Sequence, residues 1–372
     1  MAKDLQKIVV LFVGWMVIVN LFALFALNRF TLEPDTAYFW INPNEVKQEQ
    51  TWSIVSLHSR WDSYWYVDIA EHGYYLRQDT ALANVVFFPL YPLLMAIIGF
   101  ILLGNYVLAG WILSSTFLFL ALLYLYKLTK EFHPDVDPHL PLVLLLIFPT
   151  AFFLNAVYTE SLFLFLSIAA IYYAKKKKNL STGTAAFLAS LTRVTGVLLV
   201  FPLMFEYLRD KNLSFKLLFN VRVLPVLIPI VGLFGFFLYH AIAFADPILF
   251  FRVEAAWGRI FSPNIDHLMF STHPSIVHFG LDVLFLCVAV ACTIAVFKKF
   301  GKTYGSYMAA TLFVALVTGT LMSIGRYILV LFPMYILVAS ISNIYFRYTW
   351  MFVSILLFAV TTILFVNNYW AG

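Results

Sequence analysis

The sequence predicts an all-α integral membrane protein, a bundle of helices that crosses the bilayer many times. Hydrophobic residues make up 62% of the 372 residues and charged residues only 12%, whereas an ordinary soluble domain carries about 25% charged residues. So few polar side chains cannot cover this much apolar surface in water. Apolar segments also recur along the chain at the length of about 20 residues that a membrane-spanning helix needs. Lipid is therefore the expected solvent.

The apolar segments follow one another without an internal repeat, a low-complexity tract or a soluble domain, so we predict one membrane domain over residues 1–372. The first segment is too long for a signal peptide and has Lys3 and Lys7 before it, which predicts a first membrane helix with its N-terminus inside. The segments lie near residues 8–30, 86–103, 106–126, 140–174, 182–208, 223–245, 277–297, 304–322, 327–346 and 349–369.

Three polar stretches between these segments are expected to face outward together: 31–84, 246–276 and the short turn 323–326. Acidic residues outnumber basic ones in the first stretch, which follows a helix with a basic N-terminal flank. Because basic flanks stay in the cytoplasm, we expect 31–84 to be the first outer loop and to carry the catalytic residue, with 246–276 as the second outer loop.

Basic clusters at 175–178, 209–222 and 298–302 mark the inner side. Only the apolar segment 182–208 separates the first two clusters, and a single crossing would place them on opposite sides. Arg193 to Gly196 interrupt this segment and leave two arms of about 11–12 residues, too short to span hydrocarbon. We therefore predict a re-entrant hairpin with Arg193 near the outer side.

Segment 140–174 is interrupted in the same way, by Pro149 and by residues 155–160. We expect it to dip into the membrane, return and then cross. Irregular backbone at membrane depth is tolerated only where it is buried in protein or lines a cavity. The two interruptions therefore predict a polar cavity open to the outside.

The densest cluster of polar and aromatic residues runs from His58 to Gly73. Asp62, Trp65 and Ile69 recur at helical spacing, which predicts an amphipathic helix in the membrane interface. The alternative is an interfacial helix whose charges merely face water. Asp62 stands beside Trp61 and Trp65, and a carboxylate among apolar rings can become a stronger base. We therefore predict that Asp62 is catalytic.

Glu160, in the stretch from Asn155 to Ser161, lies between apolar runs, where a carboxylate is costly and by default marks a functional site. The alternative is a surface glutamate at a helix end. Arg193, Arg259 and Arg326 each stand at the outer end of an apolar run. Arginine binds phosphate through paired hydrogen bonds, so these residues predict a lipid-phosphate substrate; the alternative is that they extend toward lipid headgroups.

Metal and nucleic-acid signals are weak. Asp68, Glu71 and His72 can bind a divalent cation, but their spacing is not diagnostic. Residues 133–139 hold two histidines and two aspartates around two prolines, which predicts a solvated turn. The basic residues lie in membrane-orienting clusters, so we expect no nucleic-acid partner and no required cofactor.

Several segments, in order along the chain, resemble the signatures of the PIG-V-like mannosyltransferases, a family that includes the second mannosyltransferase of eukaryotic GPI-anchor assembly. Ser63 departs from the family pattern, which commonly has glycine there, and is expected to tighten the turn beside Asp62. The segments are Arg60–Tyr66 with Ile69–Tyr74, Phe87–Leu93, Tyr158–Leu162, Leu191–Gly196, and Ser323–Tyr327 with Phe332–Pro333.

The resemblance implies a GT-C type glycosyltransferase, which uses a polyprenyl- or dolichyl-phosphate sugar on the non-cytoplasmic face and keeps a catalytic aspartate in its first outer loop. Asp62 corresponds to that aspartate, and mannose is the sugar that the family implies. We expect inverting transfer to the hydroxyl of a lipid or glycan acceptor. The expected substrate-binding residues are Arg60, Trp61, Trp65, Glu71, His72, Tyr158, Glu160, Arg193, Arg259, Arg326 and Tyr327.

Two other classes stay open. A transporter or flippase for a lipid-linked or anionic substrate also has broken helices and charges at membrane depth, usually in two related halves. A lipid-binding scaffold needs no Asp62. As a transferase, the protein is expected in the plasma membrane of a prokaryote or in the endoplasmic reticulum membrane of a eukaryote.

Overall fold

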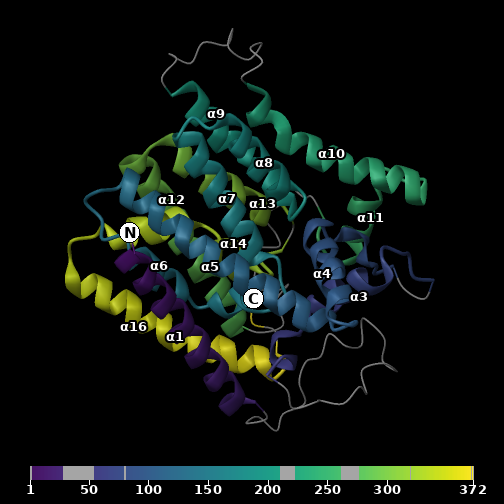
Figure 1. Cartoon of the computed structure of the whole chain (residues 1–372), viewed down its shortest axis with the longest axis horizontal. Helices are drawn as coiled ribbons and strands as arrows, with labels where there is room; N and C mark the ends of the chain where they lie inside the picture. The colour runs from purple at the N-terminus through teal and green to yellow at the C-terminus, as the bar shows by residue number, and fades with distance from the viewer. Residues whose placement is uncertain are drawn as a thin grey trace. The chain divides into compact units, whose positions relative to one another are not determined.

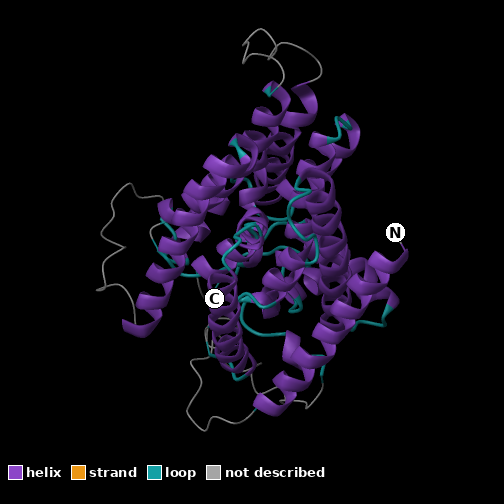
Figure 2. Ribbon diagram, turned by 90° about the vertical axis from the view of Figure 1, so that its left-hand side faces the viewer, coloured by secondary structure: helices purple, strands orange, loops and turns teal. Residues whose placement is uncertain are grey.

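The computed structural model describes residues 2–27, 54–78, 81–209, 223–260, 276–318, 320–369 and 371. Every regular element in these ranges is a helix, and none of them contains a strand (Figure 2), so the all-α prediction is confirmed. Five helices are long and apolar enough to cross a membrane. They are α1 (Ala2–Ala26), α5 (Tyr106–Phe132), α10 (Leu224–Phe244), α12 (Ile276–Phe300) and α16 (Ile344–Val366).

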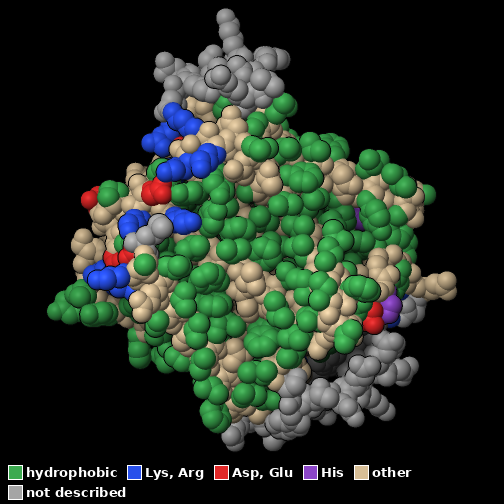
Figure 3. Space-filling model, in the orientation of Figure 1, with side chains coloured by type: hydrophobic (Ala, Val, Ile, Leu, Met, Phe, Trp, Pro, Cys, Tyr) green, Lys and Arg blue, Asp and Glu red, His purple; other side chains and the backbone are tan. Residues whose placement is uncertain are grey.

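Hydrophobic side chains cover most of the face drawn in Figure 3. Large apolar residues on the spanning helices are widely exposed: Phe25 by 70%, Phe234 by 66% and Phe352 by 64%. Such exposure is costly in water and expected in contact with hydrocarbon. The protein is thus an integral membrane protein.

The contacts divide the chain into two compact units. Unit 1 comprises residues 1–75, 91–162 and 339–372. In it α1 packs against α5 and α16 (Figure 1). Trp15 donates from Nε1 to the carbonyl of Leu146 at 2.7 Å, and Asn367 donates from Nδ2 to the carbonyl of Ala26 at 2.9 Å. The second bond ties the end of α16 to the end of α1.

The predicted break in segment 140–174 is present. Helix α6 (Leu140–Leu146) ends early, a short 3₁₀ turn η3 (Ala151–Leu154) follows, and α7 (Glu160–Lys175) begins only at Glu160. Every residue from Phe148 to Glu160 is buried. This irregular backbone therefore lies inside protein, as membrane depth requires.

Unit 2 comprises residues 76–90 and 163–338, and it contains the predicted hairpin. Helix α8 (Asn179–Ser190) runs in one direction, the chain turns at residues 191–193, and η4 (Val194–Leu199) with α9 (Val200–Leu208) returns. Helix α10 packs against α8. The turn falls at Arg193, where the polar interruption in the sequence predicted it.

The ends of this hairpin meet at an ion cluster around Glu206. Its carboxylate lies 3.5 Å from Lys175 Nζ and 3.2 Å from Arg209 Nη1, and it accepts a hydrogen bond of 2.8 Å from the Thr303 hydroxyl. The basic residues near 175, 209 and 302 therefore lie at one end of unit 2. This arrangement is the one that the positive-inside rule requires of a chain that turns back at Arg193.

The prediction of one apolar span over 327–346 is wrong. Two short helices, α14 (Ile324–Leu329) and α15 (Phe332–Ala339), occupy most of it, and both are buried in protein. Helices of 6 and 8 residues are far below the length of a span. An unbroken apolar run does not tell a lipid-facing helix from one buried in protein. Arg326, expected in a polar turn, lies within α14 and is only 4% exposed.

The hairpin turn depends on a glycine, which gives a test of its packing. A Cβ added at Gly196 would lie 2.1 Å from the backbone oxygen of Ala189. Gly196→Ala should therefore destabilise the protein by roughly 1–3 kcal/mol, measured as a lower midpoint of thermal unfolding in detergent. Gly235→Ala is the matched control because a Cβ there meets nothing within 4 Å. Equal midpoints for the two variants would contradict this packing.

Candidate functional site

The backbone around Asp62 forms a tight turn in unit 1. A 3₁₀ turn, η1 (Ser56–His58), precedes it, and α3 (Ser63–His72) follows it. Between them Trp61 has a φ of 55°, in the left-handed region. A large aromatic residue in this region costs on the order of 1–3 kcal/mol and persists only where its surroundings impose it. Asp62 occupies the N-cap of α3, is partly exposed, and makes no capping hydrogen bond with its side chain.

The hydroxyl of Tyr158 closes this turn. It donates to the backbone oxygen of Arg60 at 2.9 Å and accepts from the backbone N–H of Asp62 at 3.1 Å. The hydroxyl of Ser63 donates to the same Arg60 oxygen. The residues on both sides of Trp61 are thus held, and Ser63 adds a bond within this turn.

The side chains of Arg60 and Trp61 attach the turn to the C-terminal end of α16. The Trp61 indole donates to the carbonyl of Tyr369 at 3.2 Å. Arg60 is 8% exposed. The Arg60 guanidinium donates to the carbonyls of Ser56, Ser59 and Val366. These bonds give Arg60 a structural task; its predicted role in substrate binding stays a prediction.

Helix α3 is amphipathic, as predicted. It covers only the later part of the stretch His58–Gly73, because the backbone turns at Trp61. Trp65 and Ile69 are buried, whereas Glu71 and His72 are exposed. The Asp68 carboxylate accepts a hydrogen bond of 3.0 Å from the Tyr75 hydroxyl and lies 3.3 Å from His72 Nδ1. Within the described residues no group of three His, Cys, Asp or Glu side chains is placed to hold a metal ion.

A buried polar and aromatic cluster lies behind the turn. The Tyr91 hydroxyl lies 2.8 Å from the Ser114 hydroxyl and donates to the carbonyl of Gly110 at 3.0 Å. Ser114 donates to the carbonyl of Tyr158 at 3.2 Å. The ring of Tyr66 contacts those of Tyr91 and Tyr158 edge-on. The stretches around residues 58–74 and 158–162, which the sequence singled out separately, therefore meet Tyr91 within unit 1.

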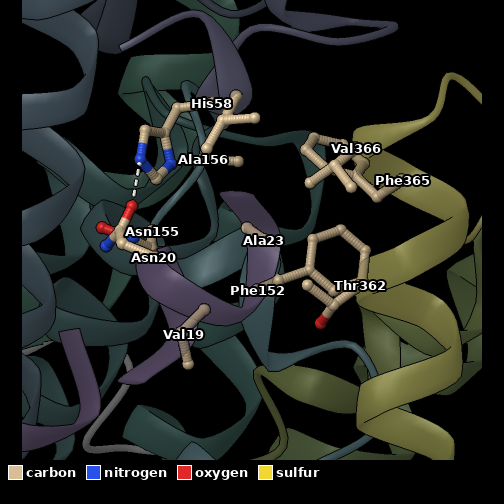
Figure 4. Close-up of a pocket in the computed structure, with 11 residues that line it drawn as sticks. Val19, Asn20, Ala23, His58, Phe152, Asn155, Ala156, Thr362, Phe365 and Val366 are labelled. Atoms are coloured by element: carbon tan, nitrogen blue, oxygen red, sulfur yellow. Dashed lines mark hydrogen bonds between the residues drawn. The ribbon is translucent and has the colours of Figure 1, made fainter. Parts of the chain in front are cut away.

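His58 anchors η1 beside a small cavity. Its ring lies 2.8 Å from Asn20 Oδ1 (Figure 4) and stacks on Trp111 at 4.6 Å between centroids. The cavity has a volume of about 20 Å³, which is room for about one water molecule. It is therefore too small for a sugar. Its walls are Val19, Asn20, Ala23, Leu57, His58, Phe152, Asn155, Ala156, Thr362, Phe365 and Val366.

Glu160 is 0% exposed and is the first residue of α7. The alternative of a glutamate on the surface is therefore excluded. A carboxylate in the first turn of a helix interacts favourably with the helix dipole, which offsets part of the cost of its burial.

A second cluster, in unit 2, is organised by Tyr327. The Arg193 guanidinium lies over the ring of Tyr327 at 5.5 Å and over that of Phe163 at 5.9 Å. Arg259 donates from Nη1 to the Tyr327 hydroxyl at 2.9 Å and lies 3.9 Å from Glu254. Two of the three arginines predicted to bind phosphate thus meet at one tyrosine, and the third, Arg326, precedes that tyrosine in the chain.

The sequence patterns missed two residues: one that links parts of the buried cluster and one carboxylate within a membrane-spanning helix. Ser114, a small polar residue inside apolar α5, links Tyr91 to Tyr158, and nothing in its spacing distinguishes it from a lipid-facing serine. Asp282 lies inside α12. Its signal was available, because a carboxylate within a membrane span is by default a functional candidate.

The fold and these two clusters define the class: a helical membrane protein with a carboxylate on a rigid turn and an arginine–tyrosine cluster. The model of the mannosyltransferase (PIG-V) family matches residues 6–253. The chain belongs to this family, as its motifs predicted.

Other comparisons add little. A search of curated proteins finds no match. The crystal structure of the apo oligosaccharyltransferase of Archaeoglobus fulgidus is similar to this chain at 15% sequence identity and a TM-score of 0.45, with 98% of this chain and 56% of that one covered. The chain thus spans just over half the length of that protein.

Burial of His58 predicts a pH dependence of stability. Desolvation, and then the charge of Arg60, lower the pKa of His58 from 6.5 to about 3. The folded state therefore excludes a proton that the unfolded state binds below pH 6.5, so the stability present above pH 6.5 falls as the pH drops toward 3. The thermal unfolding midpoint of the native protein should therefore be lower at pH 5 than at pH 7.

This drop should shrink in His58→Gln, which has no imidazole to protonate. His72→Gln is the control, because the His72 side chain is 60% exposed, and it should keep the full drop. An unchanged pH dependence in His58→Gln would show that burial of this ring does not hold it neutral.

Proposed function

We propose that the protein transfers mannose from a polyprenyl-phosphate-mannose donor to the hydroxyl of a lipid or glycan acceptor, with inversion, on the non-cytoplasmic face of the membrane. One observation carries this proposal: in a chain of the mannosyltransferase family, Asp62 is partly exposed at the start of α3, on a turn whose backbone is bonded to Tyr158. No cofactor is required, because phosphate is itself a good leaving group.

Asp62 acts as the general base. Its carboxylate takes the proton of the acceptor hydroxyl while the hydroxyl oxygen attacks the anomeric carbon of mannose. The bond from that carbon to the phosphate oxygen breaks, and the lipid phosphate leaves with the electron pair. Attack and departure occur on opposite faces of the sugar, so the anomeric configuration inverts. The partial exposure of Asp62 and the neighbouring rings of Trp61 and Trp65 support a base that is accessible and adjoins apolar surface.

Arg193, Arg259 and Arg326 stabilise the leaving phosphate. Its negative charge grows in the transition state, where positioned cations contribute most. The contacts to Tyr327 support this role. The guanidinium carbon of Arg193 lies 5.5 Å from the centre of the Tyr327 ring, and such a cation–π contact leaves the guanidinium charged. Glu160 and the exposed residues of α3, Glu71 and His72, are proposed to bind sugar and acceptor.

Asp62→Asn tests the base directly. Removal of a general base costs typically 10²–10⁴-fold, so kcat should fall by roughly that factor while the variant still binds polyprenyl phosphate. The assay follows transfer from radiolabelled polyprenyl-phosphate-mannose by protein in proteoliposomes, with the product identified by mass spectrometry. Turnover should persist in excess EDTA.

Asp68→Asn is the matched control, since it makes the same change on the same helix, and it should keep near-native turnover. Native turnover by Asp62→Asn would remove Asp62 as the base. Movement of intact donor across the vesicle membrane without transfer would instead support the flippase.

Arg193→Gln should reduce kcat/KM for the donor by roughly 10²–10³-fold, the usual effect of losing one transition-state donor. Arg193→Lys should recover little, because lysine lacks the paired N–H edge. Arg209→Gln is the control: Arg209 is 61% exposed and pairs with Glu206. If Arg193→Gln and Arg209→Gln behave alike, Arg193 does not bind the phosphate.

A further inference from the structure

We infer that Tyr158 is a positioning residue whose hydroxyl holds the left-handed turn at Trp61 and thereby aims the Asp62 carboxylate. The inference rests on the proposed function, because it needs Asp62 to be the base. It assigns Tyr158 a task other than the sugar contact expected from the sequence.

The contacts of the hydroxyl carry the argument. The hydroxyl donates a hydrogen bond of 2.9 Å to the Arg60 carbonyl and accepts one of 3.1 Å from the Asp62 N–H. These two groups belong to the peptides on either side of Trp61, so their hydrogen bonds restrain its φ and ψ. One hydroxyl therefore bridges the residue before and the residue after the strained position, across 96 to 98 residues of chain.

Tyr158 is enclosed on all sides. The side chain is 0% exposed, and its ring packs against Phe153 at 4.8 Å and Phe365 at 6.1 Å between centroids. Ser114 holds its carbonyl. A ring enclosed in this way does not swing out to a substrate, but it is a firm reference point for a turn.

Strain supplies the reason that an anchor is needed. Trp61 at φ 55° would relax to a negative φ if it were not held, because a bulky side chain is strained in the left-handed region. Relaxation would rotate the peptide that enters Asp62 and displace its carboxylate. A displacement of about 1 Å at a reacting group can cost roughly 10²-fold in rate.

Tyr158→Phe tests the inference, because it removes only the hydroxyl and keeps the packed ring. In the proteoliposome assay with polyprenyl-phosphate-mannose we expect kcat to fall roughly ten- to a hundredfold, with the donor KM within about twofold of native. Tyr335→Phe is the matched control. Tyr335 is also 0% exposed, and its hydroxyl donates to the carbonyl of Leu329 at 2.9 Å. It should lose a similar amount of thermal stability and keep its kcat.

Three results would overturn the inference: a native kcat in Tyr158→Phe, a fall no larger than that of Tyr335→Phe, or a raised KM with unchanged kcat, which is the signature of a direct substrate contact. If Tyr158→Phe does not fold, Ser63→Ala replaces it. Ser63 holds the same Arg60 carbonyl, so its kcat should fall in the same direction but by less, and an unchanged kcat would be a refutation. If Asp62→Asn loses activity while Tyr158→Phe keeps a native kcat, the positioning role alone is rejected. If Asp62→Asn keeps a native kcat, the proposed function is rejected.

Discussion

The buried hydroxyl of Tyr158 bridges the turn that carries Asp62, and bonds from Arg60, Trp61 and Ser63 support it. Tyr158 joins the backbone on both sides of Trp61, a residue whose left-handed conformation nothing local favours. The break between α6 and α7 makes this possible. A continuous helix over 140–174 would leave Tyr158 with helical neighbours, whereas the irregular stretch brings its side chain under the turn. The interruption in the helix is therefore the means by which a membrane segment reaches the functional loop.

In the arginine cluster of unit 2 a tyrosine again contacts two other residues, and here they carry charge. A cation away from water is costly unless it is paired, and Tyr327 offers its ring to Arg193 and its hydroxyl to Arg259. Neither contact neutralises a guanidinium. Glu254 also lies 3.9 Å from Arg259, so the cluster contains one ion pair beside its contacts with Tyr327.

Composition predicted the membrane class, the interruption of an apolar run predicted the hairpin at Arg193, and helical spacing predicted an amphipathic helix within residues 58–73. The resemblance of the ordered motifs predicted the family. Each rests on local chemistry that a sequence displays. The turn at Trp61 could not be predicted, because tryptophan carries no preference for a left-handed φ and its anchor lies far along the chain. The task of Arg60 was hidden for the same reason, since Val366 accepts its hydrogen bond. Segment 327–346 was misjudged because burial in protein and burial in lipid select the same residues.

The most direct test of the central claim, that Asp62 acts as a base in a single displacement, is the stereochemistry of the product. A base-assisted single displacement inverts the anomeric centre, whereas a route through a covalent sugar–enzyme intermediate retains it. NMR of the product formed from a donor of defined anomeric configuration distinguishes the two. We predict the opposite configuration in the product; the same configuration would contradict the role of Asp62 as a base.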